Sequence, residues 1–187
     1  MKSSNQNNEM EKMKAWNIYL NEKQVDTVFY NNEVTAEEVK RGLIEHDGFD
    51  SGIIIRCEVK FSGLPVDAGH ILIADADFYK NWFPKESNAW KSPVTTVEKG
   101  LYECRWNCPL SLRREGKARL KVTSGKVYVG DSCYLVGDHV WMKFLESTAN
   151  KNGEYFRRLP RGVIFINTGG DGCFKLKLEL EKIGEIT

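Results

Sequence analysis

Aspartates end two similar apolar stretches of the chain, and paired carboxylates are groups that can do chemistry. Asp75 ends the stretch 69–75, and Asp131 ends the stretch 125–131. If these two carboxylates meet, they can bind a divalent cation through oxygen or share a proton in acid–base catalysis. An aspartate at a strand end also caps the N–H groups of a turn, and we favour this simpler role. The full set of candidate carboxylates is Asp67, Asp75, Asp77, Asp131, Asp138 and Asp171.

A glycine-rich segment, Thr168-Gly169-Gly170-Asp171-Gly172, is the second candidate site. Three glycines in four positions leave backbone N–H groups that can surround an anion such as phosphate or a carboxylate. The same glycines suit a hairpin turn between the two flanking strand patterns, because a tight turn needs positive φ. We favour the turn, and the anion site stays open as the alternative.

The five cysteines and three histidines do not form a known metal or nucleophile motif. Cys104 and Cys108 make one loosely spaced pair, whereas a structural zinc site usually has two close pairs. Cys104 and Cys173 lie in strand patterns, where a buried thiol acts as a small apolar side chain. The sequence therefore predicts no cofactor. The odd number of cysteines favours a reducing, cytoplasmic compartment over a secreted, disulfide-bonded protein.

Basic residues gather between Arg113 and Lys126, where six of them accompany one acidic residue, Glu115. Tryptophans nearby could stack on single-stranded nucleic acid or anchor a protein partner. Basic and apolar residues alternate at 117–122, however, and this pattern is typical of the solvated face of a sheet, which we favour. The candidate partner-binding residues are Trp90, Trp106, Arg113, Arg114 and Lys117, with a second basic cluster at Arg157, Arg158 and Arg161.

The sequence predicts short strands and one helix in the first part of the chain. Alternating apolar residues predict two strands within 15–30, and the β-branched stretch 53–57 predicts a third. Between them, residues 35–38 (TAEE) match a capping box, which begins a helix. We therefore expect a small ββαβ module at 13–62, preceded by a disordered polar tail at 1–12.

The remaining residues, 63–187, contain four pairs of similar segments in the same order, which predicts a duplicated β–α–β–β unit. The two halves would then be related by a pseudo-twofold axis, with Asp75 and Asp131 facing one another in a central pocket. The predicted fold class is α+β, mainly β. The paired segments are 69–75 with 125–131, 78–83 with 140–145, 99–104 with 161–166, and 118–122 with 174–178.

Two short motifs carry a resemblance to known proteins. Val129-Gly130-Asp131-Ser132-Cys133-Tyr134 and the later glycine-rich segment at 168–172 resemble uncharacterised small phage and bacterial proteins. Those proteins carry a G-D-P-C-Y element at a strand exit and a later G-D-G turn. This chain has serine where their motif has proline. The resemblance implies an origin in a phage or mobile element and no particular activity.

Composition narrows the possible functions further. The 187 residues include 27 Lys+Arg and 26 Asp+Glu, a formal charge of +1, which argues against a whole-molecule polyanion binder. No stretch approaches the ~20 apolar residues that cross a bilayer, and no phosphate-binding glycine motif is present. We expect a small, soluble, non-enzymatic binding protein of the cytoplasm that acts on a host or cognate protein and not on a membrane. The alternatives are a metal-dependent hydrolase or small-anion binder using Asp75, Asp131 and Asp171, and a nucleic-acid-binding protein using residues 113–126.

Overall fold

The computed structural model describes residues 13–31, 33–78, 94–131, 133, 138–153, 159 and 162–186. The predicted tail at 1–12, Trp90, Ser132 and the arginines at 157, 158 and 161 lie outside these residues. The elements are β1 (Met13–Leu20), β2 (Lys23–Asn31), α2 (Ala36–Glu45), β3 (Ile54–Val66), β4 (His70–Asp75), β5 (Val94–Thr96), β6 (Gly100–Asn107), β7 (Glu115–Val122), β8 (Lys126–Gly130), α4 (Asp138–Thr148), β9 (Val163–Asn167) and β10 (Gly172–Gly184).

The first four elements confirm the predicted ββαβ order. The capping box forms at the start of α2: the Thr35 hydroxyl accepts a hydrogen bond from the Glu38 N–H (3.2 Å), and the Glu38 carboxylate accepts one from the Thr35 N–H (2.9 Å). The bonds that the Glu38 carboxylate accepts from the Thr35 N–H and from the Thr35 hydroxyl, the backbone one first, lower the pKa of the Glu38 carboxyl. After the helix, Gly48 has φ of +73°, which is the left-handed conformation expected where a helix ends.

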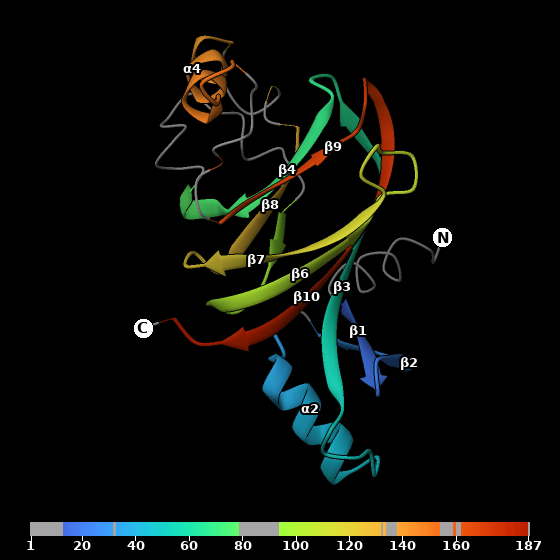
Figure 1. Cartoon of the computed structure of the whole chain (residues 1–187). Coiled ribbons are helices and arrows are strands. Elements are labelled where there is room, and N and C mark those ends of the chain that lie inside the picture. Colours follow the sequence, from blue (N-terminus) through green and yellow to red (C-terminus); the bar gives the residue numbers. More distant parts are fainter. Residues whose placement is uncertain are drawn as a thin grey trace, which may run out of the picture.

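The strands form two antiparallel sheets, which confirms the mainly β, α+β class. One sheet has six strands in the order β2-β1-β3-β10-β6-β7, and the other has four in the order β5-β8-β4-β9. Figure 1 shows the smaller sheet stacked over the β10-β6-β7 side of the larger one. Their facing sides share one apolar core, in which Ile73 and Val129 of the smaller sheet and Leu120 and Leu178 of the larger sheet are fully buried.

Each helix covers a different part of this sandwich. Val39 and Leu43 of α2 join the same core as the sheets, so α2 fills the inner face of the large sheet where the small sheet does not reach. Trp141 and Phe144 of α4 pack on the other side of the small sheet, against residues such as Leu72. The outer face of the large sheet is left uncovered by α2 and α4. Within the described ranges, no helix is long and apolar enough to span a membrane.

The predicted boundary between residues 62 and 63 falls inside β3. This strand of 13 residues pairs with β1 along residues 54–58 and with β10 along residues 57–66. Cys57 and Glu58 therefore have a partner strand on each side. The N-terminal module therefore shares a sheet and a core with the rest of the chain.

The predicted duplication is not confirmed by the strand pairing. In the first predicted half, β6 pairs with β7 in the six-stranded sheet. Their counterparts β9 and β10 lie in different sheets, because β9 pairs with β4 while β10 pairs with β3 and β6. Strands with similar sequences therefore occupy different places in the two sheets. The strand similarity does not create the predicted pocket on a pseudo-twofold axis.

Candidate functional site at the loop end of the sandwich

Asp75, at the end of β4, caps the turn between β7 and β8. Its carboxylate accepts hydrogen bonds from the backbone N–H groups of Thr123 (2.9 Å) and Ser124 (3.2 Å) and from both hydroxyls. Burial raises the pKa of the Asp75 carboxyl, but the hydrogen bonds from Ser124 and Thr123 outweigh it and hold the pKa below its ordinary value. The sequence favoured a capping role for Asp75 in the turn that follows its strand, and the structure shows capping of a turn 48 residues later in the chain.

Asp131, just after β8, caps the turn between β3 and β4 by hydrogen bonds. Its Oδ2 accepts hydrogen bonds from the N–H groups of Asp67 (2.7 Å) and Ala68 (2.6 Å), and Oδ1 accepts one from Cys133 (2.9 Å). His70 Nε2 lies 3.7 Å from Oδ1. The side chain is almost fully buried, so its lone pairs are directed at protein groups.

The predicted meeting of Asp75 and Asp131 in a central pocket is wrong. They belong to antiparallel neighbours, in which Asp75 lies opposite Val127 and Leu72 lies opposite Gly130. Antiparallel strands end at opposite edges of a sheet, so the two carboxylates lie at opposite ends of the β4–β8 pair. Asp171 is exposed in a separate loop. In the part of the chain that the structure describes, no group of three His, Cys, Asp or Glu residues is arranged to hold a metal ion.

The glycine loop (residues 168–171) links β9 to β10 and is not the predicted hairpin, because these strands lie in different sheets. Gly169 adopts the left-handed conformation with φ of +83°. Its N–H donates to Asn167 Oδ1 (2.8 Å), and the Thr168 N–H donates to the Gly69 carbonyl (3.0 Å). Two N–H groups of the suggested anion nest are therefore already bonded. The exposed residues of this segment are Gly169, Gly170, Asp171 and Gly172.

The connection between β6 and β7, which we call the leucine loop (residues 108–114), is closed by its own hydrogen bonds. The Cys108 N–H donates to the Arg114 carbonyl (2.6 Å) across the base of the loop. Ser111 then donates to the Cys108 carbonyl from both its N–H (3.0 Å) and its hydroxyl (2.8 Å). Cys108 and Ser111 are buried, so the middle of this loop is anchored to the protein.

Around this anchor the leucine loop presents apolar side chains to water. Leu110 is 73% exposed and Leu112 is 74% exposed, the highest values of any large apolar side chain in the described ranges. The exposed Arg113 and Arg114 follow directly. The Arg113 guanidinium lies over the Trp106 ring, 4.8 Å from its centre, and this cation–π contact helps to fix it.

The leucine loop and the glycine loop lie side by side at one end of the sandwich. The Arg113 N–H donates to the Asn167 carbonyl (3.3 Å). A Cβ atom placed on Gly169 would come within 2.7 Å of Leu112 Cγ, so glycine is needed there for close approach. Figure 1 shows the leucine loop, in yellow, beside the beginning of β10. The sequence predicted Arg113 with Arg114 and the glycine segment as two separate candidate sites. The structure places them side by side.

The remaining predicted partner-binding residues have different surroundings. Trp106 is 3% exposed and packs against Gly116 on β7, so its prediction as a surface for stacking is wrong. Its strand alternates, and Trp106 falls on the inner, apolar side of the sheet. Lys117, Arg119 and Lys121 are exposed on the outer side of β7, an edge strand, as the solvated-face interpretation predicted.

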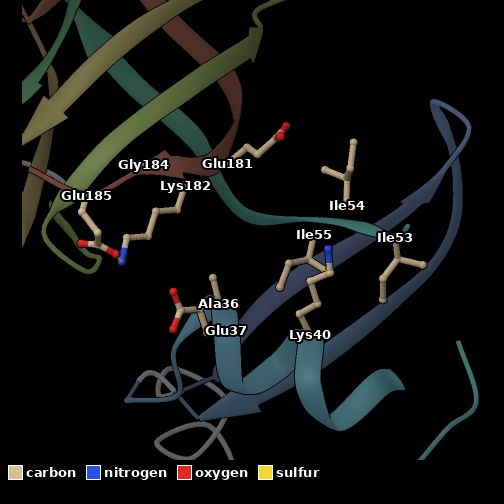
Figure 2. Close-up of a pocket in the computed structure, with 10 residues that line it drawn as sticks. All are labelled: Ala36, Glu37, Lys40, Ile53, Ile54, Ile55, Glu181, Lys182, Gly184 and Glu185. Carbon is tan, nitrogen blue, oxygen red and sulfur yellow. Dashed lines mark ion pairs between the residues drawn. The ribbon is translucent and has the colours of Figure 1, made fainter. Parts of the chain in front are cut away.

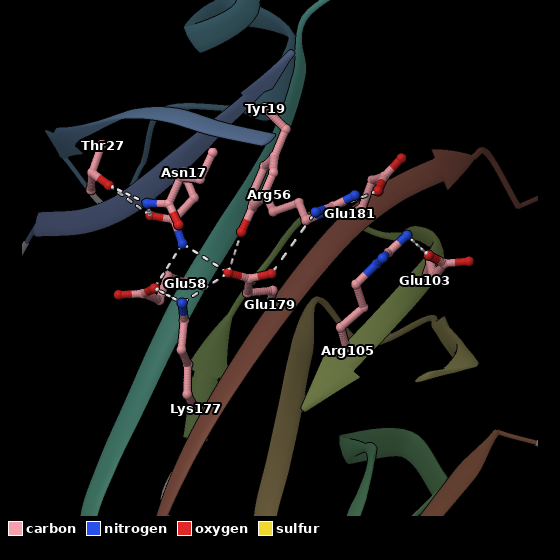
Figure 3. Close-up of polar contacts among 11 residues, drawn as sticks. Asn17, Tyr19, Thr27, Arg56, Glu58, Glu103, Arg105, Lys177, Glu179 and Glu181 are labelled. Atoms are coloured by element: carbon pink, nitrogen blue, oxygen red, sulfur yellow. Dashed lines mark hydrogen bonds and ion pairs between the residues drawn. The ribbon is translucent and has the colours of Figure 1, made fainter. Parts of the chain in front are cut away.

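A polar network on the outer face of the large sheet was not predicted from the sequence (Figure 3). Glu58 of β3 lies directly opposite Glu179 of β10. Asn17 donates to both carboxylates (2.7 and 2.9 Å), and the Lys177 ammonium pairs with both (2.8 and 3.0 Å). Tyr19 donates its hydroxyl proton to Glu179 (2.7 Å). Alternating charges in both strands were the available signal, but only the strand order shows which charges meet.

Further cations surround this network. Arg56 lies with its guanidinium 4.0 Å from the centre of the Tyr19 ring and pairs with Glu181 (3.0 Å). Lys60 pairs with Glu58 (2.6 Å). Burial raises the pKa of the Glu58 carboxyl, but the bonds from Lys177, Lys60 and Asn17 outweigh it and lower the pKa to about 2. The network holds the centre of the outer face in one arrangement.

The low pKa of Glu58 predicts a pH dependence of stability. Because the folded pKa of about 2 is below the ordinary value of 4.5, the charged network stabilises the protein above pH 4.5 and loses this contribution as the pH falls toward 2. We expect Glu58→Gln to cost about 1 kcal/mol at pH 6, since solvent at Lys60 and Lys177 screens the pairs, and much less at pH 2.5. Urea unfolding at both pH values measures this, and a cost that is equal at the two would contradict it.

Two grooves adjoin these features. One, of about 660 Å³, runs along the outer face and has an apolar wall of Met13, Ala15 and Phe29 beside the polar network. The other, of about 390 Å³, lies between α2 and the end of β10 (Figure 2). In the second groove the Lys182 ammonium is already paired with the carboxylates of Glu185 and Glu98 (2.9 Å).

Comparisons with known proteins do not identify the chain. No protein-family model matches it, and neither the curated proteins nor the solved structures contain a significant match. The resemblance to phage and bacterial proteins therefore stays a prediction, and function has to be inferred from the geometry of the sites.

Proposed function

We propose that the protein is a non-enzymatic binding protein that holds a macromolecular partner at the loop end formed by the leucine loop and the glycine loop. The observation that carries this proposal is the exposure of Leu110 and Leu112, at 73% and 74%, in a loop that hydrogen bonds fix. Large apolar side chains that stay exposed together are typical of interaction sites.

The energetics favour binding through these leucines. Burying a leucine side chain contributes roughly 1.5–3 kcal/mol, so the pair can supply much of a specific affinity. The bonds of Ser111 and Cys108 hold the loop in one conformation before binding, and a preorganised loop loses less entropy when a partner docks.

The charges beside the leucines indicate the chemistry of the partner. Arg113 and Arg114 are exposed next to Leu112, and arginine is enriched at protein interfaces because its guanidinium forms several directed bonds. We infer a protein partner with an apolar pocket rimmed by acidic residues, in keeping with the host or cognate protein expected from the sequence. No disulfide joins the cysteines in the described ranges, which supports a proposed location in a reducing compartment such as the cytoplasm.

The two alternatives have less support. A metal-dependent hydrolase would need Asp75 and Asp131 side by side, but each carboxylate accepts hydrogen bonds from a different turn. At the glycine loop the Gly169 N–H already donates to Asn167, so fewer N–H groups remain to bind an anion. A nucleic-acid binder could use the exposed Lys117, Arg119 and Lys121, but the buried Trp106 offers no stacking surface beside them.

A pull-down with a matched control tests the proposal. We expect the tagged protein to capture its partner from native cells, and the double variant Leu110→Ser/Leu112→Ser to recover at least tenfold less, as lost burial of two leucines implies. The control is Met142→Ser, which removes an apolar side chain that is 46% exposed on α4. Equal recovery by the double variant and the wild type, with unfolding temperatures unchanged, would contradict the proposal.

A further inference from the structure

The two edges of the six-stranded sheet differ in their protection against pairing. At one edge, β7 exposes Lys117, Arg119 and Lys121 at alternate positions. Lysines and arginines in this arrangement resist the approach of another strand, above all of a second β7, because like charges would meet. At the other edge, β2 carries one positive and one negative residue, Lys23 and Asp26, so it has no such barrier.

Apolar side chains are exposed at the unprotected edge. Phe29 is 62% exposed, Val25 is 50% exposed, and Met13 of the neighbouring β1 is 47% exposed opposite Asn31. β2 has nine residues and, among the strands of the described ranges, pairs only with β1. A long edge strand with exposed apolar residues is a template for pairing with another chain.

We propose that β2 pairs antiparallel with β2 of a second copy, which joins two six-stranded sheets into one. The register between β1 and β2 shifts near Val25, so the regular part of β2 begins at Asp26. Twofold pairing centred on Val28 sets Asp26 opposite Tyr30 and Phe29 opposite Thr27. No like charges meet in this arrangement, and an isologous contact of this kind closes as a dimer.

The groove on the outer face supports a second copy as the occupant. Its apolar wall, formed by Met13, Ala15 and Phe29, borders the β2 edge. In the paired sheets the two walls adjoin across the twofold axis, so both copies of Phe29 lose water contact together. The leucine loop lies between β6 and β7, on the far side of the sheet from β2, so self-association and partner binding are independent.

Sedimentation velocity over a concentration series tests this inference. We expect the wild-type mass to rise from that of one chain (21.4 kDa) to twice that value. Phe29→Lys should raise the dissociation constant at least tenfold, because it replaces an apolar side chain of the contact by a charged one. Met142→Lys, on α4, should leave the dissociation constant unchanged. Circular dichroism checks that each variant is folded.

Hydrogen exchange locates the contact. The amides of β2 should exchange more slowly at high protein concentration than at low concentration, while those of β7 should not change. A wild-type protein that stays at the mass of one chain at every concentration would overturn the inference. A dimer unaffected by Phe29→Lys would also overturn it.

Discussion

Replacement of Asp131 by alanine is expected to lower the free energy of unfolding by about 3 kcal/mol or more. The Asp131 carboxylate accepts hydrogen bonds from the backbone N–H groups of Asp67, Ala68 and Cys133 in a buried place. Alanine would leave these three part-buried donors without their acceptor; a fully buried unsatisfied group costs ~1–3 kcal/mol, so we count about 1 kcal/mol for each. Urea unfolding followed by circular dichroism measures the loss.

Two further variants separate capping from metal binding. Asp131→Asn keeps one acceptor oxygen and should lose less stability than Asp131→Ala, whereas Asp171→Ala, at an exposed position, should change stability by less than about 0.5 kcal/mol. If Asp131→Ala were as stable as the wild type but lost a thermal stabilisation by divalent ions, the capping role would be wrong and the metal hypothesis would gain support.

Gly116→Ala is expected to destabilise the protein by about 2 kcal/mol through overpacking. A Cβ atom on Gly116 would lie 2.2 Å from Cζ2 of the Trp106 ring, which is buried and has the Arg113 guanidinium over it. The ring must then move, and its cation–π contact at the base of the leucine loop moves with it. Tryptophan fluorescence and urea unfolding together report both effects.

A matched glycine provides the control for this variant. Gly184 has no atom within 4 Å of its Cβ position, so Gly184→Ala should be neutral. The double variant Trp106→Phe/Gly116→Ala should be less sensitive to the added methyl than Gly116→Ala alone, because the smaller ring leaves room. Wild-type stability in Gly116→Ala would mean that Trp106 is not held against β7.

Local features of the fold could be predicted from the sequence. The Thr35–Glu38 capping box and the left-handed Gly48 depend on residues within a few positions of one another, and both are found where expected. These two interactions need no knowledge of which strands become neighbours. Asp75 also caps a turn, but that turn lies 48 residues later in the chain and comes beside Asp75 only because β4 pairs with β8.

Long-range pairing could not be predicted in the same way. The partner of Asp131 is a turn 64 residues earlier in the chain, and Glu58 meets Glu179 only because β3 adjoins β10. Similar strand sequences suggested a duplication, but alternating apolar residues do not specify the sheet to which a strand belongs. Leu110 and Leu112 were not singled out from the sequence, because their exposure depends on the loop that Ser111 anchors.

The most direct test of the proposed function is photocrosslinking in native cells from a single site in the leucine loop. A benzophenone amino acid at position 112 should give one dominant adduct with a partner protein, and the same amino acid at position 142 on α4 should not. Substituting Arg113 and Arg114 by glutamate in the position-112 protein should remove the adduct. If position 112 gives no adduct, or only the products that position 142 also gives, the leucine loop does not bind a partner.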